Sequence, residues 1–296
     1  MESGSRLVAV AEENEEATEA WSGVLFDRFL AFKELIIAGA TEFSEAALRL
    51  HPPRPGDRVI DVGFGFGDTT RRLAGLVGPE GSAVGLDVSE PFVAAAKEDA
   101  AAAGVENVEF MARDLQVAEL AGAFDYAFSR MGTMFFANPV AALRNLRGAM
   151  APGGRLCATV WRRKIDNDWV HRAEQVVDQY LEEPEDPDDP TCGPGPFSMS
   201  NADTVSEQLQ IAGFVRPTFT RFDTPLLMGH DLDEAVSFNM ALGPAAELIR
   251  LSGDDAERIR PKLEREIREV LTDFEGPDGV RGPASTWIIS AEAPAA

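Results

Sequence analysis

The stretch from Val59 to Thr70, which reads VIDVGFGFGDTT, restricts the fold more than any other part of this 296-residue chain. Its short apolar run has the character of a buried parallel strand, and glycines follow at positions 63, 65 and 67. Glycine adopts positive φ without penalty and lets the backbone approach a ligand closely. The helical pattern that begins after the third glycine directs its free N–H groups at whatever lies over the turn. The stretch therefore predicts a nucleotide-type site between a strand and a helix.

Strand and helix patterns alternate through the middle of the chain. Apolar runs predict strands over 58–62, 83–87, 107–111, 124–129 and 154–161. Amphipathic patterns predict helices over 68–77, 89–103 and 139–150. Because β and α units alternate in this way, we expect an α/β fold with a doubly wound, mostly parallel sheet.

The flanking segments are expected to be mainly helical. Residues 1–20 are polar and predict no regular structure, and the apolar spacing over 21–50 predicts two amphipathic helices. After strand five we expect a helix over 168–181, a helix over 201–212 and a strand over 214–222, which Pro217 confines to an edge or a bulge. The segment 231–275 reads as helical, with Pro261 near its middle, and 285–291 as the last strand.

The charge balance argues against a polyanionic partner. Fifty acidic residues face 27 basic ones, which gives a net charge of −23. Such a surface repels nucleic-acid phosphate and anionic membranes. The scarcity of lysine fits a salt-tolerant cytoplasm and equally fits high-GC codon usage, and the sequence does not separate the two.

Compartment and metal content follow from what the sequence lacks. No basic leader with an apolar core and no apolar stretch of about 20 residues is present, so we expect a cytoplasmic protein without a membrane span. Cys157 and Cys192 do not form a disulfide framework. The acidic run over 182–190 is interrupted by prolines and lacks EF-hand spacing, so it predicts a solvated loop rather than a calcium site, and we expect no metal.

Acidic residues end successive predicted strands. Asp61 ends the first strand, Asp87 the second and Asp114 follows the third. A carboxylate at the second position is suited to accept hydrogen bonds from both ribose hydroxyls. With the glycine loop and the Gly153-Gly154 turn before strand five, these residues resemble the motifs of class I S-adenosylmethionine (SAM)-dependent methyltransferases. The wider chain, including the GPGPF segment at 193–197, looks like the ubiquinone/menaquinone-biosynthesis-type small-molecule enzymes of that class.

The resemblance implies a seven-stranded Rossmann-like sheet with a helical cap and SAM as the cofactor. It implies that Asp87 holds the ribose and Asp114 the adenine amino group. The implied cofactor-binding residues are Asp61, Gly63, Gly65, Gly67, Thr69, Asp87, Val88, Asp114, Leu115, Ser129 and Arg130.

The acceptor side is less specific. Where planar-nitrogen methyltransferases have Asn/Asp-Pro-Pro-Tyr after strand four, this chain has SRMGTMFF over 129–136, which disfavours DNA adenine or protein glutamine methylation. Apolar and aromatic side chains predict a lipophilic or aromatic acceptor, although packing in the core explains them equally well. The candidate acceptor-pocket residues are Trp21, Phe26, Met131, Phe135, Trp161 and Trp169.

Candidate catalytic residues are few. His171 and Arg130 are the candidates; Arg130 would bind an acidic substrate or the SAM carboxylate, or form a structural ion pair. His51 precedes the sheet and is expected to be structural, whereas His230 precedes the second helical segment. A carbon or hydroxyl acceptor needs a base, whereas a thiolate does not.

We therefore expect a SAM-dependent C- or O-methyltransferase of a small apolar or aromatic metabolite, acting as a monomer or homodimer. Its predicted divisions are an N-terminal helical cap over 1–50, a SAM-binding domain over 51–222 and 284–296, and a helical insertion over 223–283. The alternatives are an NAD(P)-dependent oxidoreductase and a non-catalytic SAM-binding module. A dinucleotide fingerprint would require glycine at position 68, where the chain has Asp68.

Overall fold

A mixed β-sheet organises the computed structural model, which describes residues 9–182 and 193–295. Its strands follow one another in the order β3-β2-β1-β4-β5-β8-β6, and the short β7 pairs with β8. The strands are β1 (Arg58–Val62), β2 (Ser82–Asp87), β3 (Val108–Ala112), β4 (Phe124–Arg130), β5 (Met150–Trp161), β6 (Val215–Gly229), β7 (Glu275–Gly276) and β8 (Gly279–Glu292). β1 to β5 pair in parallel, whereas β8 runs antiparallel to β5 and β6. This confirms the doubly wound, mostly parallel α/β sheet.

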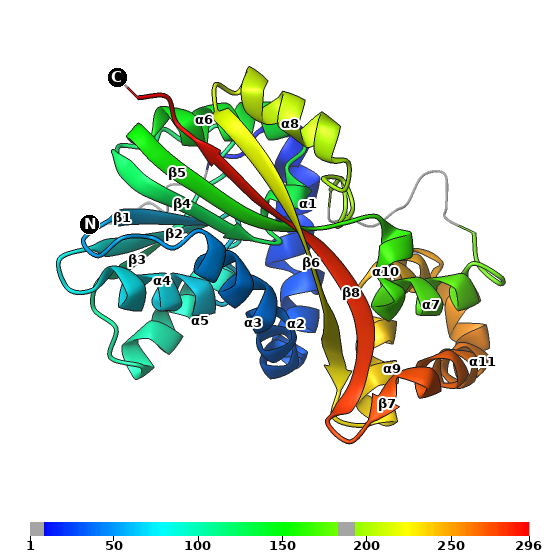
Figure 1. The fold of residues 1–296 in the computed structure, drawn as a ribbon. Coiled ribbons are helices and arrows are strands. Elements are labelled where there is room, and N and C mark those ends of the chain that lie inside the picture. Colours follow the sequence, from blue (N-terminus) through cyan, green and yellow to red (C-terminus); the bar gives the residue numbers. More distant parts are fainter. Residues whose placement is uncertain (1–8, 183–192, 296) are drawn as a thin grey trace, which may run out of the picture.

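Helices cover both faces of the sheet and one end of its long strands (Figure 1). Helices α3, α4 and α5 lie on one face and α6 and α8 on the other, while α7, α9, α10 and α11 gather beside the far halves of β6 and β8. The helices are α1 (Glu15–Ser22), α2 (Val24–Ala31), α3 (Lys33–Leu50), α4 (Asp68–Val77), α5 (Glu90–Ala102), α6 (Pro139–Gly148), α7 (Asp168–Val177), α8 (Ala202–Ile211), α9 (Leu232–Ala241), α10 (Pro244–Leu251) and α11 (Gly253–Leu271).

The N-terminal region differs from the prediction. Residues 12–20, expected to be irregular, form a 3₁₀ turn and most of α1, whereas the two helices expected over 21–50 are present as α2 and α3. Glu15 and Glu16, in the first turn of α1, interact favourably with the positive end of the helix dipole. Ala17 and Ala20 of the same helix are buried. Burial of these alanines against the rest of the protein therefore stabilises a helix in a segment whose polar composition predicts none.

The C-terminal strands are longer than expected. β6 continues from Val215 to Gly229, and β8 pairs with it along its length before also pairing with β5. The predicted divisions at 222/223 and 283/284 therefore fall inside continuous strands, and the separation of a helical insertion stays a prediction. As expected, Pro217 lies on an edge strand beside a register shift.

Smaller differences have local causes. β5 begins at Met150, before the Gly153-Gly154 turn, because Met150 already pairs with Phe124. α7 ends at Val177 rather than near residue 181. α11 continues through Pro261, and the unbonded carbonyl four residues earlier belongs to the exposed Glu257.

Two expectations concern residues of which the structure describes little or nothing. Cys192 and most of the acidic run over 182–190 lie outside the described residues. Within the described ranges, no helix is long and apolar enough to cross a membrane. No group of three or more His, Cys, Asp or Glu side chains in those same ranges is placed to hold a metal ion.

Candidate functional site

A cavity of about 1050 Å³ opens where β1, β2 and β4 end. One end is lined by the glycine loop and by Asp87, as expected where the carboxyl ends of parallel strands form a crevice. The other end lies among α2, α7, α9 and α10 and is mostly apolar. We call these two parts the donor end and the acceptor end.

The glycine loop has steric reasons for two of its glycines. Gly63, Gly65 and Gly67 all have positive φ, at 67°, 56° and 70°. A Cβ on Gly63 would lie 2.7 Å from the Gly132 Cα, and one on Gly67 would lie 2.8 Å from the Phe110 ring. A Cβ on Gly65 would meet nothing within 4 Å, so only its φ favours glycine there. Gly63 and Gly65 line the cavity, whereas Gly67 supports the loop from behind.

Asp61 lies beneath the loop rather than in the cavity. Its carboxylate is fully buried, and Oδ2 accepts hydrogen bonds of 2.7 Å from the hydroxyls of Thr69 and Thr70. Burial raises the pKa of Asp61 from 3.8 to about 6. Oδ1 is buried without a hydrogen-bond partner in the described residues. Asp61 and Thr69 therefore fix the start of α4 against β1.

Asp87 lines the donor end and orients the loop. Its carboxylate accepts hydrogen bonds from the backbone N–H of Gly65 at 3.0 Å and of Ser89 at 3.1 Å. Burial raises its pKa from 3.8 to about 6, although these backbone donors favour the ionised form. Two carboxylate oxygens can accept more than these two bonds, so capacity remains for ligand hydroxyls.

Asp114 is more enclosed than expected. It is fully buried and accepts from the backbone N–H of Ala11 at 3.0 Å and of Gln116 at 2.9 Å. Asp114 does not line the cavity, whereas Val88 and Leu115 do. The N-terminal segment thus occupies the carboxylate to which the resemblance gives the adenine amino group.

The end of β4 carries a buried ion pair and a strained residue. Arg130 binds Asp68 through two hydrogen bonds, of 2.7 and 2.8 Å, and both residues line the cavity. Met131 follows with φ of 58°, a conformation that is unusual for a side chain other than glycine and that concentrates at functional sites. Ser129 does not reach the cavity, because its hydroxyl donates to the Val62 carbonyl at 2.7 Å.

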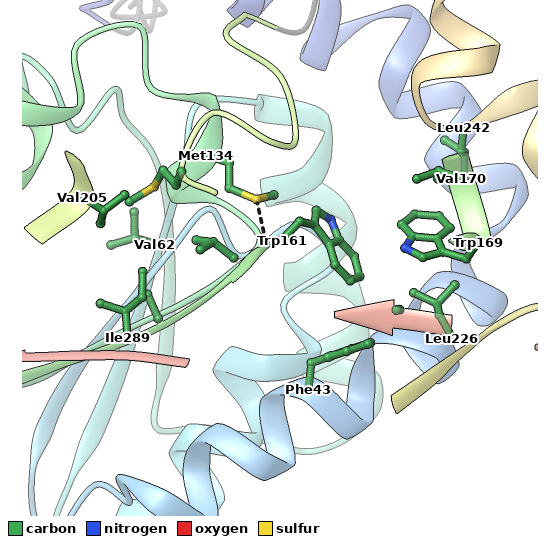
Figure 2. Close-up of a cluster of buried hydrophobic side chains, with 14 of the residues drawn as sticks. Phe43, Val62, Met134, Trp161, Trp169, Val170, Val205, Leu226, Leu242 and Ile289 are labelled. Carbon is green, nitrogen blue, oxygen red and sulfur yellow. Dashed lines mark hydrogen bonds between the residues drawn. The ribbon is translucent and has the colours of Figure 1, made fainter. Parts of the chain in front are cut away.

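Aromatic side chains line the acceptor end. Trp161 from β5 and Trp169 from α7 lie with ring centroids 5.1 Å apart (Figure 2). Trp21 packs on Phe135 at 4.8 Å. These four and Met131, all candidate acceptor-pocket residues, line the cavity, whereas Phe26 does not and packs instead on Phe92 of α5.

No histidine of the described residues lines this cavity. His171 lies behind Glu174, with its Nδ1 3.7 Å from Glu174 Oε2. His230 is exposed and pairs with Glu234, while the His51 carbonyl accepts from the Tyr126 hydroxyl. His171 is therefore not brought into contact with a ligand in the cavity.

Charged residues that the sequence patterns do not single out also line the acceptor end. Lys164 and Glu174 form an ion pair of 2.6 Å, and Arg28 and Glu247 lie on other walls. No local motif marks these residues. Lys164 and Glu174 lie ten residues apart, whereas Arg28 and Glu247 lie on helices far from them in sequence. Only the amphipathic spacing of those helices could have indicated an inward face.

The donor end fits a nucleoside joined to an amino acid. The loop supplies backbone at two cavity-lining glycines with positive φ, Asp87 supplies hydroxyl acceptors, and Asp68 with Arg130 supplies groups of both charges. The cavity continues into an apolar chamber in which a second molecule can lie against the first. These features meet the requirements of SAM and an acceptor.

Comparisons with known proteins agree with this geometry. Residues 53–185 match a family model described as a methyltransferase domain. The demethylmenaquinone methyltransferase of Bacillus cytotoxicus is 34% identical over 37% of this chain and 46% of its own length. The nocamycin O-methyltransferase of Saccharothrix syringae is 35% identical over 46% of this chain and 49% of its own. The chain thus spans about half the length of these curated relatives.

A solved structure resembles the fold over a larger share of this chain than the curated relatives cover. A putative methyltransferase from Bacillus halodurans superposes with a TM-score of 0.54 at 16% identity, covering 84% of this chain and 98% of that one. At this identity the similarity concerns the fold alone.

Proposed function

We propose that this chain is a class I SAM-dependent methyltransferase that transfers a methyl group from SAM to carbon or oxygen of a small apolar or aromatic metabolite. The match of residues 53–185 to a methyltransferase-domain model supports this proposal. The observation that carries the proposal is the continuity of the cavity. The glycine loop and Asp87 at one end adjoin a chamber lined by Trp161 and Trp169 at the other.

Each group that lines the donor end has a proposed role in binding SAM. Asp87 accepts hydrogen bonds from the ribose hydroxyls, and the backbone of Gly63 and Gly65 lies close to the ligand. Asp68 and Arg130 offer an anion and a cation to the amino-acid moiety. Val88 and Leu115 flank the adenine ring, whereas Asp114, already bonded to Ala11 and Gln116, supports that wall from behind.

The acceptor end works mainly by positioning and by excluding water. SAM supplies an electrophilic methyl group, so alignment of the acceptor atom provides much of the rate. Aromatic rings give rigid apolar walls for a flat acceptor. The relatives named above are called methyltransferases of a demethylmenaquinone and of nocamycin, which supports a small-molecule acceptor here. We assign no catalytic base.

Ligand binding tests the donor first. Calorimetric titration should show binding of S-adenosylhomocysteine (SAH) and none of NAD or NADP. Binding of NAD without SAH would instead support the oxidoreductase alternative, which position 68 disfavours because it carries Asp68 where a dinucleotide fingerprint has glycine.

Methyl transfer is tested next. Transfer of label from [methyl-³H]SAM to a panel of quinols, phenols and polyketides should identify an accepted class. Tight SAH binding with no transfer across the panel would favour the non-catalytic SAM-binding module.

A further inference from the structure

Arg28 places a guanidinium in the wall of the acceptor end, and no carboxylate of the described residues forms an ion pair with it. The residue is half-buried on α2 and lines the cavity. Its one hydrogen bond within the described residues runs from Nη1 to the Ala241 carbonyl, at a long 3.4 Å. Within the described ranges Arg28 forms no ion pair, and Glu247, a carboxylate that acts on its charge, pairs with Arg250 instead. A guanidinium has five N–H donors, so most of its capacity remains unused.

The surroundings make an unpaired cation costly at this position. Burial lowers the pKa of Arg28, and the neighbouring Arg250 lowers it further. Glu247 raises it, but this carboxylate is engaged by two hydrogen bonds from Arg250, of 3.0 and 2.9 Å. Arg28 therefore adjoins a carboxylate that Arg250 already engages, in a protein whose net charge is −23.

We propose that Arg28 is the anchor for a carboxylate carried by the methyl acceptor. This inference rests on the proposed function and narrows its substrate to an apolar, ring-bearing acid. A carboxylate matches the guanidinium through parallel N–H···O bonds, which are strong and orient the ligand. The surrounding apolar wall, which includes Leu242 and Leu248, would contact the body of the same molecule.

The carboxylate would serve for recognition rather than as the methylated group. A carboxylate engaged by a guanidinium has its lone pairs occupied and is a weakened nucleophile. Phe29, the next residue on α2, packs against Phe92 on the donor side, whereas Arg28 reaches α9. The anchor therefore lies on the side of α2 that faces α9.

The test compares two probes that differ in charge and little in shape, 2-naphthoate and 2-naphthamide. Their dissociation constants are measured by calorimetry with wild-type protein, with and without saturating SAH. We expect naphthoate to bind at least about tenfold more tightly than naphthamide, as for a hydrogen-bonded ion pair. Equal binding of the two probes by the wild-type protein would overturn the proposal.

Substitutions then assign the preference to Arg28. Arg28→Gln should bring the two probes within about twofold of each other while naphthamide binding stays near its wild-type value. Arg28→Lys keeps the positive charge but lacks the planar pair of N–H donors, so it should retain part of the preference for naphthoate over naphthamide. Arg281→Gln, an exposed site outside the cavity, removes the same charge and should leave the preference intact.

The variants also separate a structural role from recognition. If Arg28 only fastens α2 to α9, Arg28→Gln will weaken both probes equally and leave their ratio unchanged, which overturns the anchor. Failure of the proposed function is distinct, because it appears as absent SAH binding. A naphthoate preference that Arg28→Gln removes in SAH-free protein would uphold the anchor even then.

Discussion

The two ends of the cavity are built in different ways. The donor end is made of backbone: glycines with positive φ, the N–H groups of Gly65 and Ser89, and strand ends in fixed register. The acceptor end is made of side chains from helices and strands that are distant in sequence. Backbone geometry has few solutions, whereas an apolar wall accepts many side chains of similar volume.

This difference predicts steep responses at the donor end and graded ones at the acceptor end. It also explains why a methyl donor can be read from residue spacing while the acceptor cannot. Variants that change the affinity for SAH without changing the affinity for an acceptor-end probe, or the reverse, would support this distinction between the two ends. Variants that change both affinities equally would argue against it.

The largest effect is expected for Gly63→Ala. The new Cβ meets the Gly132 backbone at 2.7 Å and the residue retains positive φ. Left-handed φ costs about 1–2 kcal/mol and overpacking about 1–3 kcal/mol more. Urea denaturation should show this loss, and displacement of the loop should weaken SAH binding by roughly a hundredfold.

Gly65→Ala is the matched control. It carries the same type of φ, at 56°, with no atom within 4 Å of the new Cβ. Only the backbone cost of about 1–2 kcal/mol should appear. Equal destabilisation by the two substitutions would refute the role of the Gly63–Gly132 contact.

Asp61 predicts a pH dependence of stability. Its folded pKa of about 6 lies above the ordinary 3.8, so between these values the folded state holds a proton that the unfolded state has released. The contribution of Asp61 to stability is therefore full below about pH 4 and falls as pH rises to about 6. The loss is at most about 3 kcal/mol.

Asp61→Asn should abolish this contribution. The amide oxygen still accepts from a threonine hydroxyl, and the buried group no longer ionises. The unfolding free energy of the variant minus that of the wild type should increase between pH 4 and pH 7, as denaturation at each pH will show. A difference that stays constant across the range would rule out titration of Asp61 there.

Asp87→Ala tests the ribose assignment. Loss of hydrogen bonds to a charged group should weaken SAH binding by about 1–3 kcal/mol. Binding of 2-naphthamide at the acceptor end should not change. Glu90→Ala removes an exposed charge from the first turn of the neighbouring α5 and serves as the control. Unchanged SAH affinity in Asp87→Ala would remove this residue from the site.

Local sequence predicts the glycine loop and the start of α4, because the residues that determine them are close in the chain. Asp61 binds hydroxyls eight and nine residues away, and α4 spans the predicted 68–77. Tertiary contacts explain what sequence reasoning missed. Asp114 is closed off by Ala11, which lies 103 residues away, and Arg28 contacts a carbonyl 213 residues away.

The length of β6 and β8 was underestimated for a similar reason. The sequence from Thr224 to Gly229, which includes Pro225, predicts a strand only weakly. In the structure these residues pair with Ala284 to Val280 of β8. Strand pairing between distant segments has no local signature beyond alternation. The same long strands position α9 and α10, so the walls of the acceptor end depend on the same non-local strand pairing.

The smallest effect is expected at the acceptor end, for Phe238→Leu. Phe238 packs edge-on against Phe32 at 5.6 Å and near Trp169 at 6.3 Å. Replacing Phe238 by another apolar side chain, leucine, should lower the free energy of unfolding by about 1 kcal/mol and leave SAH affinity within about twofold.

Phe219→Leu is the control, because Phe219 packs on Trp287 outside the cavity and its replacement should lower the free energy of unfolding by a similar amount. Only the Phe238 variant should change the relative affinities of one-ring and two-ring probes, since only it reshapes the acceptor wall. If Phe238→Leu lowered SAH affinity as strongly as Asp87→Ala, the two ends would share their determinants, and the distinction between a backbone-built donor end and a side-chain-built acceptor end would fail.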